Sequence, residues 1–373
     1  MMLHIPKPTG HFGVSKIIFP LVDKKRKETH GGNGHRELMI ALYYPTDAAH
    51  SSPYAAEIMP LMKENLAASM GVPLEQLAYL DNYKEHSRIN EPLTTARATF
   101  PVLFFSPGLG DPVDLYASLL EEMASHGYVV MAINHTYAVN PTVFPDGRII
   151  RMDPKLANFL PVNHHPFEQL LDAEQEIWIN DAHCVIDAIT NIKPGDPYSF
   201  LRNKLDYGAM GMFGHSFGGS LALHMARERT DIKACADLDG LMFGPASKRS
   251  NPFSAPSMFV VAGKQVTDQE LKTHNMTRDD YDRLVQSRLA WSMYEKLEND
   301  SFYITILDAQ HNSFSDSNLL VSPLKTDGYE PVQIINTVRT CLVEFFDDYV
   351  RNERLNMEVL GSLPNVVIEN NRE

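Results

Sequence analysis

The sequence has few cysteines and no long apolar segment, and both absences narrow what it encodes. Only three cysteines occur among its 373 residues, Cys184, Cys235 and Cys341, and each lies in an apolar stretch. Because their separation matches neither a disulfide framework nor a metal site, we interpret them as buried free thiols. No apolar run approaches the roughly 20 residues of a transmembrane helix, so we do not expect an integral membrane protein.

Positive charge is scarce as well, and nothing resembles a leader. The chain carries 33 lysines and arginines against 47 aspartates and glutamates, a formal net charge of −14. A nucleic-acid-binding protein would show a basic footprint, so we expect no nucleic acid partner and no strong attraction to anionic lipid. The opening residues MMLHIPKPTG lack the apolar centre of a signal peptide, which favours the cytoplasm. A secreted or periplasmic location would need a targeting segment ahead of this sequence.

The chain does contain a series of patterns typical of buried strands. Apolar residues make up 44% of it, enough for a sizeable core. Continuous apolar runs alternate with helix-like stretches, which indicates a mostly parallel sheet with helices on both faces. Two β-rich segments, 16–22 and 37–44, predict an antiparallel start to that sheet. We find no repeat or linker and therefore predict one α/β domain over residues 1–373. The later strand patterns span 102–106, 128–134, 208–214, 233–239, 257–263 and 302–308, and the longest helical patterns span 167–191 and 332–351.

Two segments interrupt this alternation and are predicted to be helical insertions. Residues 55–82 are rich in methionine, leucine and alanine at helical spacing, and residues 264–296 form the second insertion. An ordinary packing role is one interpretation of the first segment. The other is a cap or lid over a pocket, in transient contact with a membrane surface.

The residues GMFGHSFGGS at 211–220 contain the strongest chemical signal. Gly214 to Gly218 form the motif G-x-S-x-G between an apolar strand pattern and an apolar helix pattern, which is the context of a nucleophile elbow in an α/β-hydrolase. The elbow places its serine in a strained turn above the carboxyl edge of the sheet, at the N-terminus of a helix. We predict Ser216 as the nucleophile.

A serine needs a base, and in this architecture the base follows the acid along the chain. The downstream histidines are His224, His274 and His311. His224 lies too far into the helix after the elbow, and His274 lies in the charged insertion. His311 directly follows the strand pattern FYITILD, at the edge where the serine emerges, and is therefore predicted to be the base.

The acid that orients this histidine is not decided by position alone. Asp237 and Asp239 both end the strand pattern KACADLD, with Asp239 nearer the catalytic edge. Asp268 follows the next strand, at a position that many hydrolases of this fold use. All three aspartates stay open on this evidence.

The negative charge on a tetrahedral intermediate needs two backbone donors. One is predicted to be the amide of Phe217, the residue after the nucleophile. The other is predicted to be Leu109, in the loop Ser-Pro-Gly-Leu-Gly at 106–110, for which a plain strand-ending turn is the alternative. His135, at the end of another strand pattern, is a candidate for lining the pocket, with a structural hydrogen bond as the alternative. His215 is interpreted as a packing residue.

At these residues the sequence resembles the platelet-activating factor acetylhydrolase family, from residue 8 to the closing helix. In that family the acid closes the strand after the nucleophile helix, in a segment similar to 238–243, which selects Asp239, 23 residues after Ser216. Animal members have a histidine where this chain has Pro107, so the preference for substrate is open. The segments that carry the resemblance are RELMIALYYP, FFSPGLG, ASHGYVV, FGHSFGG, LDGLMF and the HNSF loop.

The resemblance implies a serine esterase that acts through an acyl-enzyme and requires no cofactor and no metal. Its expected substrates are esters with short or oxidised acyl groups, such as those at the second position of glycerophospholipids. A general short-chain carboxylesterase or a polyester hydrolase is the alternative within the same class. A non-catalytic binding protein that kept the fold is a more remote one.

Overall fold

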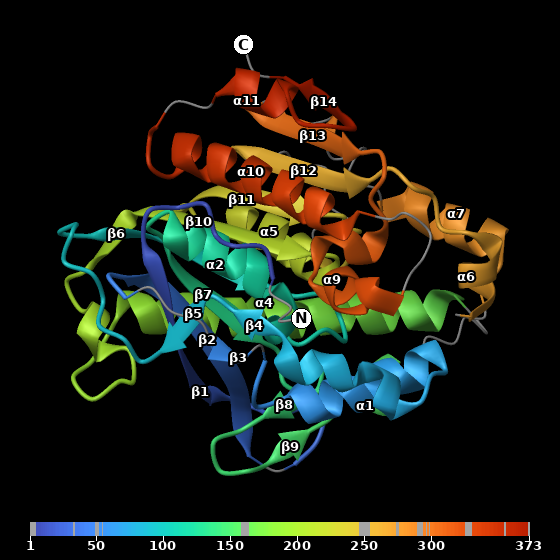
Figure 1. Cartoon of the computed structure of the whole chain (residues 1–373), viewed down its shortest axis with the longest axis horizontal. Helices are drawn as coiled ribbons and strands as arrows, with labels where there is room; N and C mark the ends of the chain where they lie inside the picture. The colour runs from blue at the N-terminus through green and yellow to red at the C-terminus, as the bar shows by residue number, and fades with distance from the viewer. Residues whose placement is uncertain are drawn as a thin grey trace.

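A computed structural model of the chain describes residues 5–32, 34–48, 52–53, 55–157, 164–245, 254–273, 276–288, 294–295, 297, 299–324, 330–353 and 356–371. Within them, ten strands form one sheet in the order β14-β13-β12-β11-β10-β6-β7-β2-β1-β5 (Figure 1). The strands are β1 Gly13–Lys27, β2 His35–Thr46, β5 Ser87–Ile89, β6 Phe100–Ser106, β7 Val129–Asn134, β10 Leu205–His215, β11 Ile232–Leu238, β12 Ser257–Ala262, β13 Ser301–Ile306 and β14 Val366–Asn370.

The sheet is parallel at its centre, antiparallel pairs lie on both sides of that centre, and the short edge strand β5 is parallel to β1. Strands β7, β6, β10, β11, β12 and β13 pair in parallel. Strand β2 is antiparallel to both β1 and β7, and β14 is antiparallel to β13. The predicted α/β class, with its antiparallel start, is confirmed, and the chain has the α/β-hydrolase fold.

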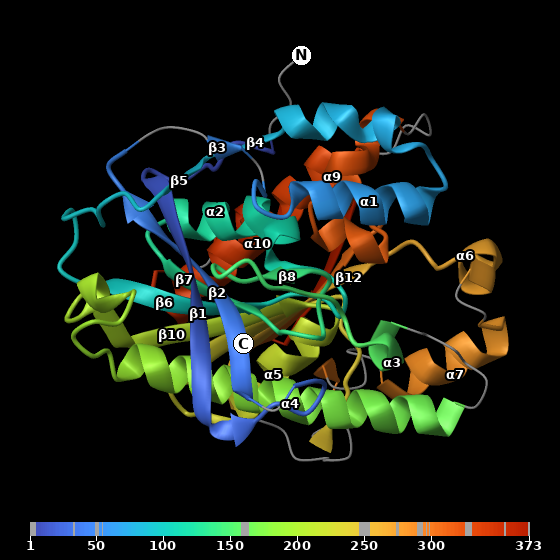
Figure 2. The ribbon, with the colours of Figure 1, turned by 90° about the horizontal axis from the view of Figure 1, so that it is seen from below.

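Helices cover both faces, because the central strands are apolar on both sides. Every residue of β6 and β7 is buried. Leu103 and Phe105 of β6 pack in the cluster that contains α2 (Ala117–Ser125) and α10 (Pro331–Tyr349). Val102 and Phe104 pack in the opposite cluster, with α4 (His164–Thr190) and α5 (Phe217–Glu228). Figure 2 shows the sheet between these two helical layers.

The first predicted insertion consists of two helical pieces packed on the body of the protein. Helix α1 (Met59–Met70) ends at Gly71, whose φ of 64° is left-handed, and the 3-10 helix η1 (Leu74–Asn82) follows Pro73. The hydroxyls of Tyr79 and Tyr83 donate to backbone carbonyls of α9 (Ser317–Val321) at 2.7 and 3.1 Å. Its inner face therefore packs as ordinary core, and a lid role stays a prediction.

The second insertion contains α6 (Asp268–Thr273) and α7 (Arg278–Arg288), which lie beyond the carboxyl end of β12 (Figure 1). No helix among the described residues is long and apolar enough to cross a bilayer. The three cysteines are free; Cys235 and Cys341 are buried, as predicted, whereas Cys184 is only half-buried. The remaining short elements are β3 Ser52–Pro53, β4 Lys84–Glu85, β8 Thr142–Val143, β9 Ile149–Ile150, α3 Pro154–Ala157, α11 Met357–Gly361, η2 Val113–Tyr116, η3 Ser199–Leu201, η5 His311–Phe314 and η6 Ser322–Leu324.

Candidate active site

Ser216 stands alone between β10 and α5, in a backbone conformation that serine rarely adopts. Its φ is 55° and its ψ is −118°. Such a conformation costs of order 1–3 kcal/mol and persists only where the surroundings enforce it. Here the Ser216 amide donates to the carbonyl of Leu238 at 2.8 Å, which ties the turn to the end of the neighbouring strand.

The glycines around Ser216 allow close approach of other backbone and side-chain atoms. A Cβ atom on Gly218 would overlap the carbonyl oxygens of Ser106 and Pro107, which are backbone atoms that cannot rotate away. A Cβ atom on Gly214 would overlap the carbonyl of Gly218. The glycine cluster therefore lets the elbow, its helix and the loop after β6 meet without intervening side chains. The carboxyl group of Asp237 lies in the same way against Gly219, and the ring of Phe346 lies against Gly211.

His311 lies between Ser216 and Asp239 and contacts both. Its Nε2 atom is 3.0 Å from Ser216 Oγ, and its Nδ1 atom is 2.7 Å from Asp239 Oδ2. A carboxylate only accepts hydrogen bonds, so Nδ1 carries the proton and Nε2 is free to accept from the serine hydroxyl. The three residues predicted as nucleophile, base and acid are thus joined by a continuous series of hydrogen bonds.

Both partners of this histidine are held by the ends of neighbouring strands. Asp239 directly follows β11, with a φ of 56°, and its Oδ1 atom accepts from the Ala262 amide of β12 at 2.8 Å. His311 begins the 3-10 turn after β13, which Gln310 and Ser313 close with a capping box. Three parallel strands therefore deliver the three side chains to one carboxyl edge.

The charges of the pair shift both acidities in the direction that a base and its orienting acid require. Although the loss of hydration at the bottom of the site opposes protonation, the hydrogen bond and charge of Asp239 raise the pKa of His311 above its ordinary value. Burial alone would raise the pKa of Asp239, but the hydrogen bond and charge of His311 hold it below its usual range. Asp239 is therefore a carboxylate at neutral pH.

The other candidate acids and bases lie elsewhere. Asp237 is buried one layer deeper, where its Oδ1 atom accepts from the Gly240 amide at 2.9 Å. Asp268 is bonded to Arg278 at the start of α6, and His224 contacts the carbonyl of Phe243 at 2.6 Å. His274 lies outside the described residues.

The backbone amides of the two predicted oxyanion donors, Leu109 and Phe217, have no hydrogen-bond partner within the described part of the chain. Around Leu109 the amides are used: Gly108 donates to Tyr116 Oη at 3.0 Å and Gly110 donates to the carbonyl of Ala138 at 2.8 Å. The loop after β6 is thus fixed on both sides of one free amide.

His215, which we interpreted as packing, connects the loop of His311 with Tyr116, which in turn contacts the loop after β6. Its Nε2 atom donates to the carbonyl of His311 at 2.9 Å, and its Nδ1 atom lies 2.8 Å from Tyr116 Oη. Tyr116 also contacts Asp111 and accepts from the Gly108 amide, as above. Burial lowers the pKa of His215 to about 3, so its ring is neutral at any working pH. The sequence carried no signal for this link, because Tyr116 lies 99 positions from His215.

His135 is fully buried and both of its ring nitrogens are hydrogen-bonded, to Ser106 and to Asp181. The structural alternative for this residue is therefore the one that the contacts favour, and not the pocket-lining one.

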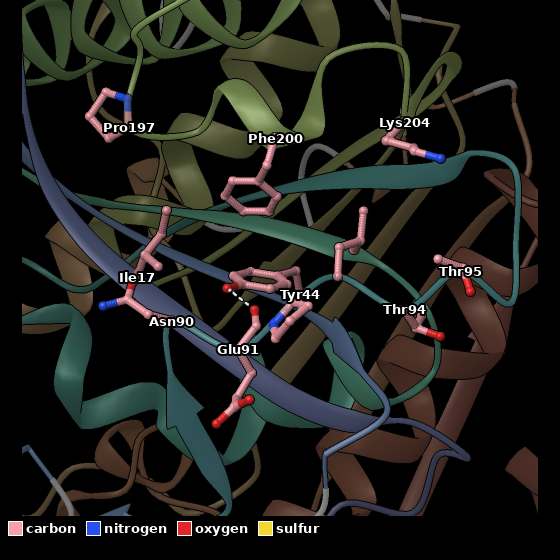
Figure 3. Close-up of a pocket in the computed structure, with 11 residues that line it drawn as sticks. Ile17, Tyr44, Asn90, Glu91, Thr94, Thr95, Pro197, Phe200 and Lys204 are labelled. Carbon is pink, nitrogen blue, oxygen red and sulfur yellow. Dashed lines mark hydrogen bonds between the residues drawn. The ribbon is translucent and has the colours of Figure 1, made fainter.

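A pocket of about 440 Å³ lies at the opposite, amino edge of the parallel strands. Figure 3 shows the rings of Tyr44 and Phe200 facing each other within it. The residues that line it include no histidine, serine or cysteine, so it does not form part of the candidate site. In the described ranges, no group of three or more histidine, cysteine, aspartate or glutamate side chains could hold a metal ion.

Comparisons with known proteins find one matching family and several similar chains. The sequence matches the family "Platelet-activating factor acetylhydrolase, isoform II" over residues 2–147 and 179–329. It is 23% identical over 331 residues to a probable 1-alkyl-2-acetylglycerophosphocholine esterase of Arthroderma benhamiae, a match that covers 84% of this chain and 76% of that protein. It is also 27% identical over 140 residues to the cutinase est1 of Thermobifida alba, covering 38% of this chain and 35% of that protein.

The fold has a close structural counterpart. A ferulic acid esterase from Streptomyces cinnamoneus superposes with a TM-score of 0.73 at 21% identity, covering 99% of both chains. At that identity the likeness concerns the fold.

Proposed function

Because the chain belongs to the platelet-activating factor acetylhydrolase, isoform II family, we propose that it hydrolyses carboxylic esters through an acyl-enzyme on Ser216. The observation that carries this proposal is the unbroken series from Ser216 through His311 to Asp239, beside two unengaged amides. In this proposal the structure needs no further group for catalysis.

In the first half of the reaction, Ser216 Oγ attacks the ester carbonyl while His311 Nε2 takes the hydroxyl proton. Asp239 keeps the imidazole in the correct tautomer and stabilises the imidazolium. The amides of Leu109 and Phe217 donate to the carbonyl oxygen as it becomes negative, each worth roughly 3–4 kcal/mol in related sites. The imidazolium then protonates the leaving alcohol, and the C–O bond of the ester breaks.

In the second half, water takes the place of the alcohol. His311 removes a proton from this water, whose oxygen attacks the acyl carbon, and the same two amides hold the second oxyanion. The proton returns from His311 to Ser216 Oγ as the acyl–serine bond breaks. The carboxylic acid product leaves and gives its proton to the solvent, and the enzyme is restored without a net change in its own protonation.

The acyl group is proposed to be short or oxidised, as at the second position of a glycerophospholipid. Family membership and the similarity to an alkylacetylglycerophosphocholine esterase support this. Transient contact with a membrane surface through residues 55–82 belongs to the same proposal, and so does a cytoplasmic location.

A general short-chain carboxylesterase is the second candidate, including one that hydrolyses polyesters. The similarity to a cutinase favours it, as does Pro107, which removes a polar side chain from the loop that carries Leu109. Both candidates use the same chemistry and differ only in what the site accepts.

Burst kinetics with p-nitrophenyl acetate and p-nitrophenyl decanoate, on the parent and on Ser216→Ala, test the shared chemistry. We expect a burst of p-nitrophenol that the substitution abolishes, because acylation releases the phenol before water hydrolyses the acyl-enzyme. A much faster hydrolysis of p-nitrophenyl acetate than of p-nitrophenyl decanoate supports a short acyl pocket. A parent without serine-dependent turnover on either ester contradicts the proposal and favours a binding protein.

Hydrolysis of a phospholipid ester distinguishes the two candidate functions. An sn-2 acetyl glycerophospholipid hydrolysed at least as efficiently as p-nitrophenyl acetate favours the phospholipid substrate. Turnover of the simple ester alone favours the general esterase.

A further inference from the structure

A second series of serine, histidine and aspartate lies beneath the loop that carries Leu109. Ser106 Oγ is 3.0 Å from His135 Nε2, and His135 Nδ1 is 2.9 Å from Asp181 Oδ2. All three residues have no exposed surface. A hydroxyl that no substrate reaches cannot serve as a nucleophile. We call these three residues the buried array.

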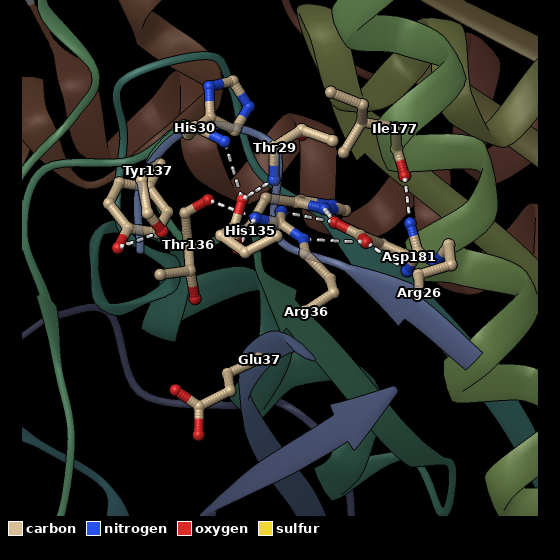
Figure 4. A network of polar contacts seen from close by, with 12 residues as sticks. Arg26, Thr29, His30, Arg36, Glu37, His135, Thr136, Tyr137, Ile177 and Asp181 are labelled. Atoms are coloured by element: carbon tan, nitrogen blue, oxygen red, sulfur yellow. Dashed lines mark hydrogen bonds and ion pairs between the residues drawn. The ribbon is translucent and has the colours of Figure 1, made fainter. Parts of the chain in front are cut away.

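The direction of each hydrogen bond in the buried array follows from its charged end. The Asp181 carboxylate also accepts from Arg36 Nη2 at 2.7 Å and from Arg26 Nη2 at 2.6 Å (Figure 4). A carboxylate has no proton to give, so His135 donates from Nδ1. Burial lowers the pKa of His135, which keeps the ring neutral. Its Nε2 atom therefore accepts, and Ser106 donates its hydroxyl proton to it.

The array ends at the point where β6 becomes the oxyanion loop. Ser106 is the last residue of β6, and Leu109 follows three positions later. The carbonyls of Ser106 and Pro107 lie directly against Gly218, two residues after the nucleophile. A small rotation at Ser106 would therefore change both the contact with the elbow and the direction of the Leu109 amide.

The array also reaches the second donor, through an indole ring. Trp178 of α4 stacks on His135 with ring centroids 3.8 Å apart and an interplanar angle of 8°. The Trp178 ring also makes a T-shaped contact with the Phe217 ring, with ring centroids 4.8 Å apart and an interplanar angle of 86°. Trp178 is itself fixed, since its Nε1 atom donates to Glu174 Oε1 at 2.9 Å.

We infer that Ser106, His135 and Asp181 are positioning residues that hold the Leu109 and Phe217 amides at the spacing an oxyanion requires. The inference rests on the proposed function for its consequence in catalysis. Its structural part, that the array holds the loop, is independent of the substrate.

Ser106→Ala is the sharpest test, because it removes one hydroxyl and leaves the His135–Asp181 pair intact. A misplaced donor costs about 10- to 100-fold in kcat. We expect that loss on p-nitrophenyl acetate with KM unchanged, because the negative charge on the carbonyl oxygen is absent from the bound substrate and develops only as the tetrahedral intermediate forms. The inhibition constant of an alkyl trifluoromethyl ketone, whose hemiketal oxygen occupies the oxyanion position, should rise by the same factor.

Ser257→Ala is the matched control. Ser257 is also a fully buried serine on a central strand, whose hydroxyl donates to the carbonyl of Ala255 at 2.9 Å, but it begins β12 at the amino edge. The Ser257→Ala substitution should lower the melting temperature about as much as Ser106→Ala does. Its kcat and inhibition constant should stay within about twofold of the parent values.

His135→Asn probes the same link from the other side. The asparagine amide can still donate to Asp181, so no buried charge is left unpaired, but nothing accepts from Ser106. Both substitutions remove the Ser106–His135 hydrogen bond, and His135→Asn also removes the ring that stacks on Trp178. We therefore expect the double substitution to lose no more activity than His135→Asn alone. Full additivity of the two losses would overturn the inference.

Hydrogen–deuterium exchange separates failure of this inference from failure of the esterase proposal. The amides of Gly108 and Gly110 should exchange faster in Ser106→Ala than in the parent. In Ser257→Ala their exchange rates should equal those of the parent. Both expectations hold whether or not the parent hydrolyses esters. An active parent whose Ser106→Ala variant keeps its kcat, or a variant with unchanged exchange in the loop, overturns the inference. An inactive parent with faster exchange in the variant refutes the esterase proposal and supports the positioning role.

Discussion

Asp237 and Asp239 lie two positions apart, yet the pKa values of their carboxyl groups are shifted in opposite directions. Asp239 is paired with His311 and is ionised, as described above. Burial, followed by the charge of Asp239, raises the pKa of Asp237 from 3.8 to about 8. Two neighbouring carboxylates would repel each other, and the more deeply buried one, Asp237, is the one that keeps its proton. The neutral one is structural, and the ionised one faces the imidazole.

The pH dependence of hydrolysis should report the Asp239–His311 pair. The base must be neutral to accept a proton, so activity should rise with pH through the pKa of His311, which lies above the ordinary value of about 6.5. Asp239→Asn removes the charge that raises this pKa, so the acidic limb of kcat/KM should move to lower pH. The same change should reduce kcat about 10⁴-fold, because the wrong tautomer is favoured. If the acidic limb of kcat/KM lay at the same pH in the parent and in Asp239→Asn, a group other than His311 would be the one that titrates.

Asp237→Asn should stabilise the protein, and more so at alkaline pH. Between pH 4 and pH 8 the folded protein retains a proton on Asp237 that the unfolded chain has lost, so the free energy of unfolding falls as pH rises. Asparagine can still accept from the Gly240 amide and carries no such cost. The gain should therefore be roughly 2–4 kcal/mol larger at pH 8 than at pH 5, measured by denaturant unfolding. An equal gain at both pH values would mean that the carboxyl is ionised in the folded state.

Among the secondary-structure elements, the elbow and the oxyanion loop act as one unit because Gly218 lies against two backbone carbonyls. Backbone atoms cannot move aside as a side chain can, so a substitution there must separate the two segments. Each segment supplies one of the proposed oxyanion donors. The distance between those donors therefore depends on the absence of a single methyl group.

Gly218→Ala should accordingly reduce kcat at least 100-fold and lower the melting temperature by several degrees. Gly361→Ala, at the end of α11, is the control, because a Cβ atom there meets nothing within 4 Å. That variant should match the parent in both measurements. A Gly218→Ala enzyme with parental kcat would show that the two segments can separate without consequence.

Much of the fold and of the site could be predicted because the local signals were strong. Apolar runs such as 102–106 became strands buried on both faces, and chain order placed His311 after the nucleophile. Strand β14 was missed because a short run in a polar tail resembles an extended end. The links made by His215 and His135 could not be predicted, because Tyr116 and Asp181 are brought to them only by the folded sheet.

On the scale of the whole molecule, segments from both ends of the chain share one core. Ile5 and Leu360 belong to the same cluster of buried residues, and β1 and β14 belong to the same sheet. A boundary anywhere between them would cut through the sheet or the core.

The prediction of one domain therefore has a calorimetric consequence. Scanning calorimetry should show one transition, with the calorimetric enthalpy equal to the van't Hoff enthalpy. A chain truncated after residue 353, which removes β14, should still melt in one step but at a lower temperature. Two resolved transitions in the full chain would contradict the single domain.

The hydrogen bonds that hold the proposed oxyanion donors come from the loops after β6 and β7, from η2 and from α4, and in the described part of the chain none comes from α1, α6 or α7. Those three helices border the molecule around the carboxyl edge. Mutational drift can therefore reshape them while the reaction itself is conserved. A lineage with this architecture can change the ester that it accepts through substitutions in α1, α6 and α7. Laboratory evolution aimed at a new acyl chain should therefore begin with libraries in these three helices.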